Sequence, residues 1–222
     1  LGDKIIERKV ENIVRYIKIA FERNIKDFRF ISANAFSYCS SSDSPNIIAI
    51  EELLSSIRTV IKDKGRIFFG TFPSEVRPDF VTTEIMEILK KYVDNKKIII
   101  GAQSGSDRIL NLAHRGHSVK IIENAINISL SSGFAVDVDI IIGMPDEREE
   151  DIQETFNLIH KYKNKSVRFH LHYFMPLPGT PWQNKKPFEI PQKFLRDIEY
   201  LTGRGVVWGN WKKQRLTIAK EY

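Results

Sequence analysis

The chain has 222 residues, of which 42% are hydrophobic and 28% charged, and its formal net charge is +6. This composition is enough for an α/β domain with a sizeable core and excludes a disordered chain. A single cysteine excludes a disulfide framework and a cysteine-only metal site within the chain. No apolar run is long enough to span a membrane and no signal-peptide pattern is present, so we expect a cytoplasmic protein without membrane contact.

Apolar periodicity divides the chain into alternating helices and strands. Helical spacing predicts helices over residues 7–23, 51–62, 82–92, 118–131, 149–161 and 191–202, with a short one from Ser106. β-branched and aromatic runs predict strands over residues 27–33, 66–72, 97–103, 136–142 and 167–174. Residues 205–213 fit neither pattern clearly, although Trp208 and Trp211 are expected to pack them down.

Strands that alternate with helices predict a parallel sheet with right-handed crossovers. The chain opens on a helix, whereas a helix of a parallel barrel normally follows a strand. We therefore expect one strand to be missing upstream of Leu1. The predicted strand 27–33 would then be a sheet edge with unpaired backbone groups, so we expect either symmetric self-association through this edge or local disorder there.

Two glycine-containing turns follow buried strands. Residues 101–108 (GAQSGSDR) follow the run 98–100, and residues 143–147 (GMPDE) follow the strand 136–142. Each turn opens a helix at the carboxyl end of a parallel strand, which is where α/β barrels and doubly wound sheets bind their ligands. Both turns are therefore candidate ligand-binding segments.

Polar side chains fall on one face of the strand 136–142. Asp137, Asp139 and Ile141 alternate with the wholly apolar opposite face. A buried parallel strand is usually apolar on both faces, so these carboxylates indicate a polar lumen. A salt bridge from Asp139 to Arg115 or Arg168 is an equally weighted alternative.

Two histidines, His170 and His172, share a face of the last predicted strand. Such a pair could ligate a metal, but no third ligand is evident from the sequence, so we predict no metal site. We expect both histidines to line the lumen and contact a ligand.

Several motifs in this order carry a family resemblance. They are residues 101–110 (GAQSGSDRIL), 114–117 (HRGH) and 139–145 (DIIIGMP), together with 72–78 (FPSEVRP) and 174–181 (FMPLPGTP). The chain resembles the radical S-adenosylmethionine (SAM) superfamily over essentially its whole length. More narrowly, it is similar to the branch that contains methylthiotransferases and cobalamin-binding radical SAM proteins, in particular an archaeal subgroup.

The resemblance implies a partial (β/α)6 TIM-like barrel of parallel strands, with its first strand absent from this chain. In the family, a CxxxCxxC loop after that strand holds a 4Fe–4S cluster, and reductive cleavage of SAM yields a 5′-deoxyadenosyl radical. Cys39 cannot replace three thiolates, so we expect the cluster ligands upstream of a cropped chain. Residues 1–190 would form the barrel core and residues 191–222 a C-terminal helical extension.

The resemblance also assigns SAM-binding positions at the strand ends. They are Ser32, Asn34, Gln103, Ser104, Asp139, Ile141, Gly143 and His172. Gln103 and Ser104 would contact the ribose or carboxylate, Ile141 and Gly143 would lie beneath the adenine, and Asn34 would accept a hydrogen bond from the methionyl ammonium. As alternatives, Gln103 stabilises its turn and Ser106 or Asp107 caps a helix. Asp146 stands where the family usually has glycine in a tight turn.

The function implied is that of a radical SAM enzyme with an unknown substrate and no assigned catalytic residue, joined to cobalamin through an absent N-terminal domain. One alternative is an RNA-modifying methylthiotransferase, which would normally carry a C-terminal RNA-binding domain. Another is a catalytically idle barrel that serves as a binding or scaffold module. The modest positive charge favours a lysine-rich solvated surface over nucleic-acid contact.

Overall fold

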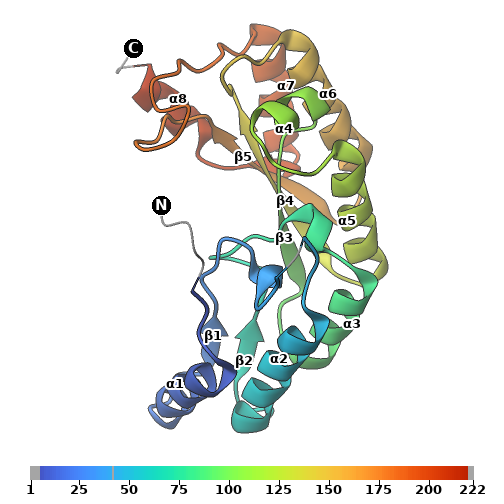
Figure 1. Cartoon of the computed structure of the whole chain (residues 1–222). Helices are drawn as coiled ribbons and strands as arrows, with labels where there is room; N and C mark the ends of the chain where they lie inside the picture. Colours follow the sequence, from blue (N-terminus) through green and yellow to red (C-terminus); the bar gives the residue numbers. More distant parts are fainter. Residues whose placement is uncertain (1–5, 42, 220–222) are drawn as a thin grey trace. The chain divides into compact units, whose positions relative to one another are not determined.

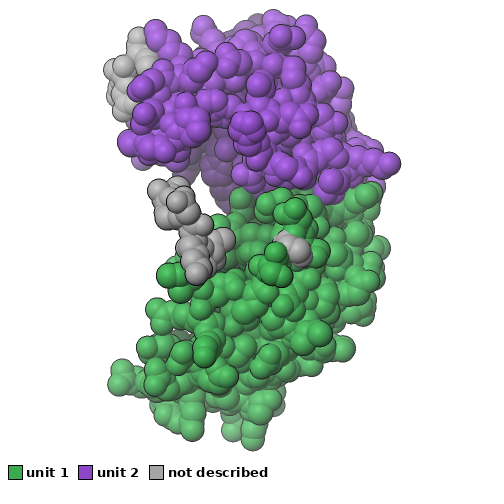
Figure 2. All heavy atoms as spheres, in the orientation of Figure 1, with its two compact units in different colours: residues 1–100, 124–135 green, residues 101–123, 136–222 purple. Residues whose placement is uncertain are grey.

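The structure is a computed structural model that describes residues 6–41 and 43–219. The chain forms two compact units, which are coloured separately in Figure 2. Unit 1 comprises Leu1–Ile100 and Asn124–Ala135, and unit 2 comprises Gly101–Glu123 and Val136–Tyr222. Strand β3 (Lys97–Gln103) and helix α5 (Val119–Ser131) each have residues in both units. No helix among the described residues is long and apolar enough to cross a bilayer.

Unit 1 contains a two-stranded parallel sheet and three helices of its own. Its regular elements are α1 (Val10–Glu22), β1 (Asp27–Arg29), α2 (Ile47–Ile61), β2 (Arg66–Phe68) and α3 (Thr83–Tyr92). Strands β1 and β2 lie side by side in Figure 1, with Phe28 opposite Ile67. Both of these side chains are buried, so the core of unit 1 begins at this pair.

Both strands of unit 1 are shorter than the sequence predicts. β1 ends at Arg29 because a side chain replaces the strand ladder beyond it. The Ser74 hydroxyl donates to the carbonyl of Phe30 (2.7 Å) and accepts from the amide of Ser32 (2.8 Å). These two bonds satisfy backbone groups that a longer β1 would have paired with a neighbouring strand.

Side-chain caps determine where two helices of unit 1 begin. The Thr82 side chain accepts a hydrogen bond from the amide of Ile85, so Thr82 is the N-cap of α3. Helix α2 begins at Ile47, earlier than predicted, because Asn46 caps it through the amide of Ala49. An asparagine in this position satisfies a backbone donor of the first turn.

Unit 2 is built on parallel strands. Its elements besides β3 and α5 are α4 (Asp107–Leu112), β4 (Ala135–Ile142, whose first residue belongs to unit 1), α6 (Glu149–Tyr162), β5 (Val167–Tyr173), α7 (Gln192–Gly203), β6 (Val207–Trp208) and α8 (Trp211–Ile218). The sheet order is β3-β4-β5-β6, and β5 pairs in parallel with both β4 and β6. The α/β class with parallel strands is thus as predicted.

The segment that the sequence left ambiguous contains a strand and the start of a helix. β6 is a two-residue strand that pairs with the middle of β5, so Trp208 lies opposite His170. Trp211 is buried, as expected, whereas Trp208 is 41% exposed. Residues beyond 190 therefore contribute a strand to the same sheet as β5. That residues 191–222 form an extension separate from the barrel core stays a prediction.

Gly70 and Gly203 provide an internal comparison of what glycine does in this chain. A Cβ at Gly70, whose φ is +71°, would lie 2.7 Å from a ring carbon of the fully buried Phe36. We expect Gly70→Ala to lower the free energy of unfolding by about 2 kcal/mol, through overpacking and backbone strain. Gly203→Ala meets open space near the end of α7 and should stabilise by about 0.5 kcal/mol. Urea unfolding of both variants measures the difference, and equal effects would contradict it.

Candidate functional site

Three of the predicted site residues lie at the carboxyl ends of neighbouring strands in unit 2. Gln103 is the last residue of β3, Gly143 directly follows β4, and His172 is the penultimate residue of β5. The sheet order makes these strands consecutive neighbours. Parallel strands end at one edge of a sheet, so the sequence correctly predicted that these segments come together.

The turn after β3 is held against helix α6. Gln103 is 8% exposed and has a φ of +71°, so the backbone turns sharply there. A Cβ at Gly105 would lie 2.5 Å from the Cα of Thr155, so only glycine permits this close approach. The Ser104 hydroxyl accepts from the amide of Ser106 (3.1 Å) and lies 3.4 Å from the Thr155 hydroxyl. Its side chain therefore serves the packing of the turn, and a role in ligand binding stays a prediction.

A buried carboxylate, Asp151 of α6, fixes the start of α4. It accepts hydrogen bonds from the Ser106 hydroxyl (2.6 Å), the Arg108 guanidinium and the Arg148 amide (2.8 Å). Burial works to raise the pKa of Asp151, but the bonds from Arg108, Ser106 and Arg148 outweigh it and hold this pKa below its ordinary value. Ser106 thus occupies the N-cap position of α4 while its side chain binds Asp151.

The turn after β4 is organised by Glu147. Its carboxylate accepts from the backbone amides of Gly143 (2.7 Å) and Met144 (3.0 Å). Gly143 has a φ of +77°, and a Cβ there would lie 2.7 Å from the ring of Tyr173. Asp146 adopts the left-handed conformation with a φ of +63°, so aspartate provides here the geometry for which glycine is the usual residue.

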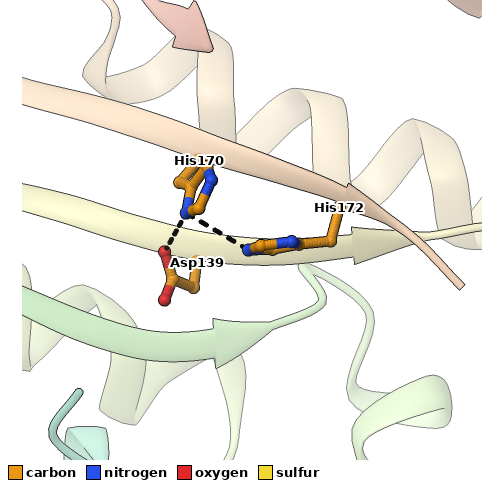
Figure 3. A group of neighbouring side chains, drawn as sticks. All are labelled: Asp139, His170 and His172. Atoms are coloured by element: carbon orange, nitrogen blue, oxygen red, sulfur yellow. Dashed lines mark hydrogen bonds and ion pairs between the residues drawn. The ribbon is translucent and has the colours of Figure 1, made fainter. Parts of the chain in front are cut away.

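Asp139, His170 and His172 form a cluster in the middle of the sheet (Figure 3). Asp139 lies directly opposite His170, whose Nδ1 is 3.1 Å from the Asp139 carboxylate and 3.2 Å from Nε2 of His172. His170 is thus a partner of Asp139, while Arg168 pairs with the buried Asp137 (3.1 Å). Arg115 donates to the carbonyl of Gly101. The alternative of an Asp139 bridge to Arg168 is therefore replaced by a carboxylate–histidine pair.

Sequence reasoning missed a third potential ligand beside the histidine pair. Asp139 supplies it, and the three candidate ligand atoms lie within 4.8 Å of one another. No sequence spacing connects Asp139 with His170, because the two residues meet only through the register of β4 and β5. Partial exposure of Asp139 and Ile141 agrees with the predicted polar face of β4.

The two site candidates in unit 1, Asn34 and Ser32, differ in which side-chain atoms remain free to hydrogen-bond a ligand. The amide oxygen of Asn34 accepts from the backbone amides of Phe36 and Arg77 (both 3.2 Å). Its buried Nδ2 has no hydrogen-bond partner among the described residues. Asn34 is therefore available as a donor, and not as the acceptor of an ammonium group that the sequence suggested. The Ser32 hydroxyl donates to the carbonyl of Asn34 (2.9 Å).

The residues of this chain do not fit an iron–sulfur cluster. Cys39 is the chain's single cysteine, and it is exposed in unit 1 with a free thiol. A cluster of the expected kind needs three thiolates close together. The cluster ligands are thus not among these 222 residues.

The chain is an α/β protein with parallel strands, and its candidate binding turns follow the carboxyl ends of these strands. This arrangement is typical of α/β barrels. Residues 2–159 match the model of the radical SAM superfamily. The chain belongs to that superfamily, as its motifs predicted.

Curated relatives include enzymes named tRNA-2-methylthio-N(6)-dimethylallyladenosine synthase. Those of Buchnera aphidicola and Baumannia cicadellinicola are 31% and 29% identical, over 82% and 81% of this chain. The match covers 40% and 39% of those relatives, so the chain spans well under half of their length.

Solved structures share the fold at low sequence identity. The radical SAM enzyme coproporphyrinogen III oxidase of Escherichia coli has a TM-score of 0.63 at 17% identity, over 92% of this chain and 49% of that one. The radical SAM methyltransferase TsrM of Kitasatospora setae has a TM-score of 0.59 at 13% identity, over 80% and 33%. These neighbours support the partial-barrel fold class.

Glu147 should make stability depend on pH. Its burial outweighs the two backbone hydrogen bonds and raises the pKa of this carboxyl to about 8. Between pH 4.5 and 8 the folded chain keeps a proton that the unfolded chain releases. The free energy of unfolding should therefore fall as pH rises, by at most about 1.4 kcal/mol per pH unit.

Glu147→Gln should remove this slope, because glutamine still accepts from both amides but does not titrate. Glu150→Gln, an exposed residue of α6, is the matched control and should keep the slope. Urea unfolding between pH 5 and 9 measures it, and an unchanged slope in Glu147→Gln would refute the assignment.

Proposed function

We propose that this chain is the SAM-binding part of a radical SAM enzyme. The observation that carries the proposal is that Gln103, Gly143 and His172 stand at or just beyond the carboxyl ends of three strands that are consecutive in one sheet. This is the edge at which sheets of this kind bind nucleotide-like ligands. Membership in the radical SAM superfamily makes SAM the ligand that this edge best fits.

The residues of unit 2 fit SAM in one respect. The partly exposed side chain of Ile141 offers an apolar surface for a flat adenine ring. Gln103 and His172 would then orient the sugar and the methionyl portion through hydrogen bonds.

SAM, when bound beside a reduced cluster, supplies a 5′-deoxyadenosyl radical that abstracts hydrogen from a substrate. Since this chain has a single cysteine, it lacks the three thiolates that hold such a cluster. Its own residues are therefore proposed only to bind and orient SAM and to exclude water. Cobalamin, bound by a domain outside this chain, is part of the proposal on the sequence resemblance alone. Relatives at 13–14% identity that bind cobalamin share a fold with this chain and do not bear on its cofactors.

Ile141→Ala should weaken SAM binding about tenfold, because part of the apolar contact with adenine, about 1.4 kcal/mol, is lost. Isothermal titration of SAM into the chain measures the dissociation constant. The matched control is Ile48→Ala on helix α2, whose side chain is 80% exposed, and it should leave the affinity unchanged. Absence of SAM binding, or equal affinities of the two variants, would favour an idle scaffold.

A second candidate function is RNA modification by a methylthiotransferase, supported by the names of the curated relatives. The substrate would then be a tRNA nucleoside. We expect bulk tRNA to bind the chain in a mobility-shift assay, with an affinity that falls steeply between 50 and about 200 mM salt. A DNA duplex of similar length is the control. Equal binding of both, or none at low salt, would argue against this candidate.

A further inference from the structure

Asp139, His170 and His172 present three ligand atoms at one point of the sheet (Figure 3). We propose that they form a binding site for a single divalent transition-metal ion such as Zn²⁺ or Fe²⁺. The ligands would be a carboxylate oxygen of Asp139, Nδ1 of His170 and Nε2 of His172. The proposal does not depend on SAM or on an iron–sulfur cluster.

The separations between the ligand atoms suit a common metal ion. Nδ1 of His170 is 3.1 Å from the Asp139 oxygen and 3.2 Å from Nε2 of His172. Ligands about 2.0–2.1 Å from a metal lie about 2.9 Å apart at octahedral angles and about 3.3 Å apart at tetrahedral angles. Both of these separations fall within this interval, and all three ligand atoms lie within 4.8 Å of one another, so rotation of the Asp139 or His172 side chain would complete the geometry.

Without a metal, one proton on Nδ1 of His170 or on Nε2 of His172 links neighbouring atoms of this cluster. A proton on Nδ1 of His170 has two acceptors, the Asp139 carboxylate and Nε2 of His172, at nearly equal distances. A proton on Nε2 of His172 would bond to His170 but leave the carboxylate facing a nitrogen lone pair. A divalent cation interacts favourably with all three atoms at once.

The surroundings hold His170 in position. Its ring stacks on Trp208 with a centroid distance of 3.9 Å and an interplanar angle of 9°. A Cβ at Gly209 would lie 3.0 Å from the same imidazole and 2.2 Å from the carbonyl of Leu171, so glycine lets the chain pass close by. The ligands also stand on paired strands, which position side chains more rigidly than loops.

The residue set points to a transition metal with room for a further ligand. Two imidazoles and one carboxylate are the donors of many zinc and non-haem iron sites. The side chains of His170 and Asp139 are 24% and 18% exposed, so the site is reachable. Three protein ligands leave coordination positions for water or for an oxygen of a bound ligand. The metal would then polarise that oxygen as a Lewis acid.

The test uses the chain without a polyhistidine tag and without SAM. Isothermal titration should show one Zn²⁺ bound per chain, and Co²⁺ should produce visible absorption bands that Zn²⁺ abolishes. Asp139→Asn and His172→Gln should each weaken Zn²⁺ binding about tenfold or more. His172→Gln leaves the stacking of His170 on Trp208 in place, so it is the variant expected to keep the fold.

His160→Gln is the matched control, because His160 also pairs with a carboxylate, Asp197, at 2.7 Å but has no second histidine in that pair. It should bind Zn²⁺ as the wild type does. Zn²⁺ should also raise the melting temperature of the wild type and of His160→Gln, but not of His172→Gln. No binding, unchanged affinity in the Asp139 and His172 variants, or equal loss in His160→Gln would overturn the proposal. If a separate titration shows that the chain does not bind SAM, the metal-site proposal is unaffected.

Discussion

Asp139 meets His170, and Ile141 meets His172, because β4 and β5 pair in parallel in one register. Side chains alternate between the two faces of a strand. A shift of the pairing by one residue would therefore move the side chains of Asp139 and Ile141, or those of the two histidines, to the opposite face of the sheet. The buried residues that alternate with them, such as Val138 and Leu171, make such a slip costly. The register of two strands therefore decides both the candidate SAM edge and the proposed metal site.

The turns that complete this edge are held from outside the sheet. Gly105 lies against the backbone of α6, and Asp151 of the same helix binds Ser106 and Arg108. Glu147, just before α6, binds the amides at Gly143 and Met144. One helix and its entry turn thus position the two turns that are candidates for ligand binding, since buried, hydrogen-bonded side chains leave the backbone little freedom. Rigid turns of this kind suit a site that must orient a flexible ligand.

The sequence predicted the elements of unit 2 closely and those of unit 1 less well. The strand at Val167–Tyr173 has a long apolar pattern that packing reinforces, so its bounds were nearly right. β1 ended early because Ser74, distant in sequence, bonds to Phe30 and Ser32. β6 was missed because two residues carry no periodicity, and its pairing with β5 alone defines it. Long-range side-chain bonds and short edge strands leave no local signal.

The sequence by itself determined the superfamily, the parallel α/β class and the place of the glycine-containing turns that are candidates for ligand binding, because glycine-rich motifs after apolar runs are local patterns. The left-handed conformation of Asp146, where the family usually has glycine, is a finding of the structure. Only the tertiary structure decided which side chains meet: Asp139 with the two histidines, Arg168 with Asp137, and Asn34 with its amide oxygen already committed. Such partners come from different strands and loops, and their meeting depends on register and packing, which no single segment encodes.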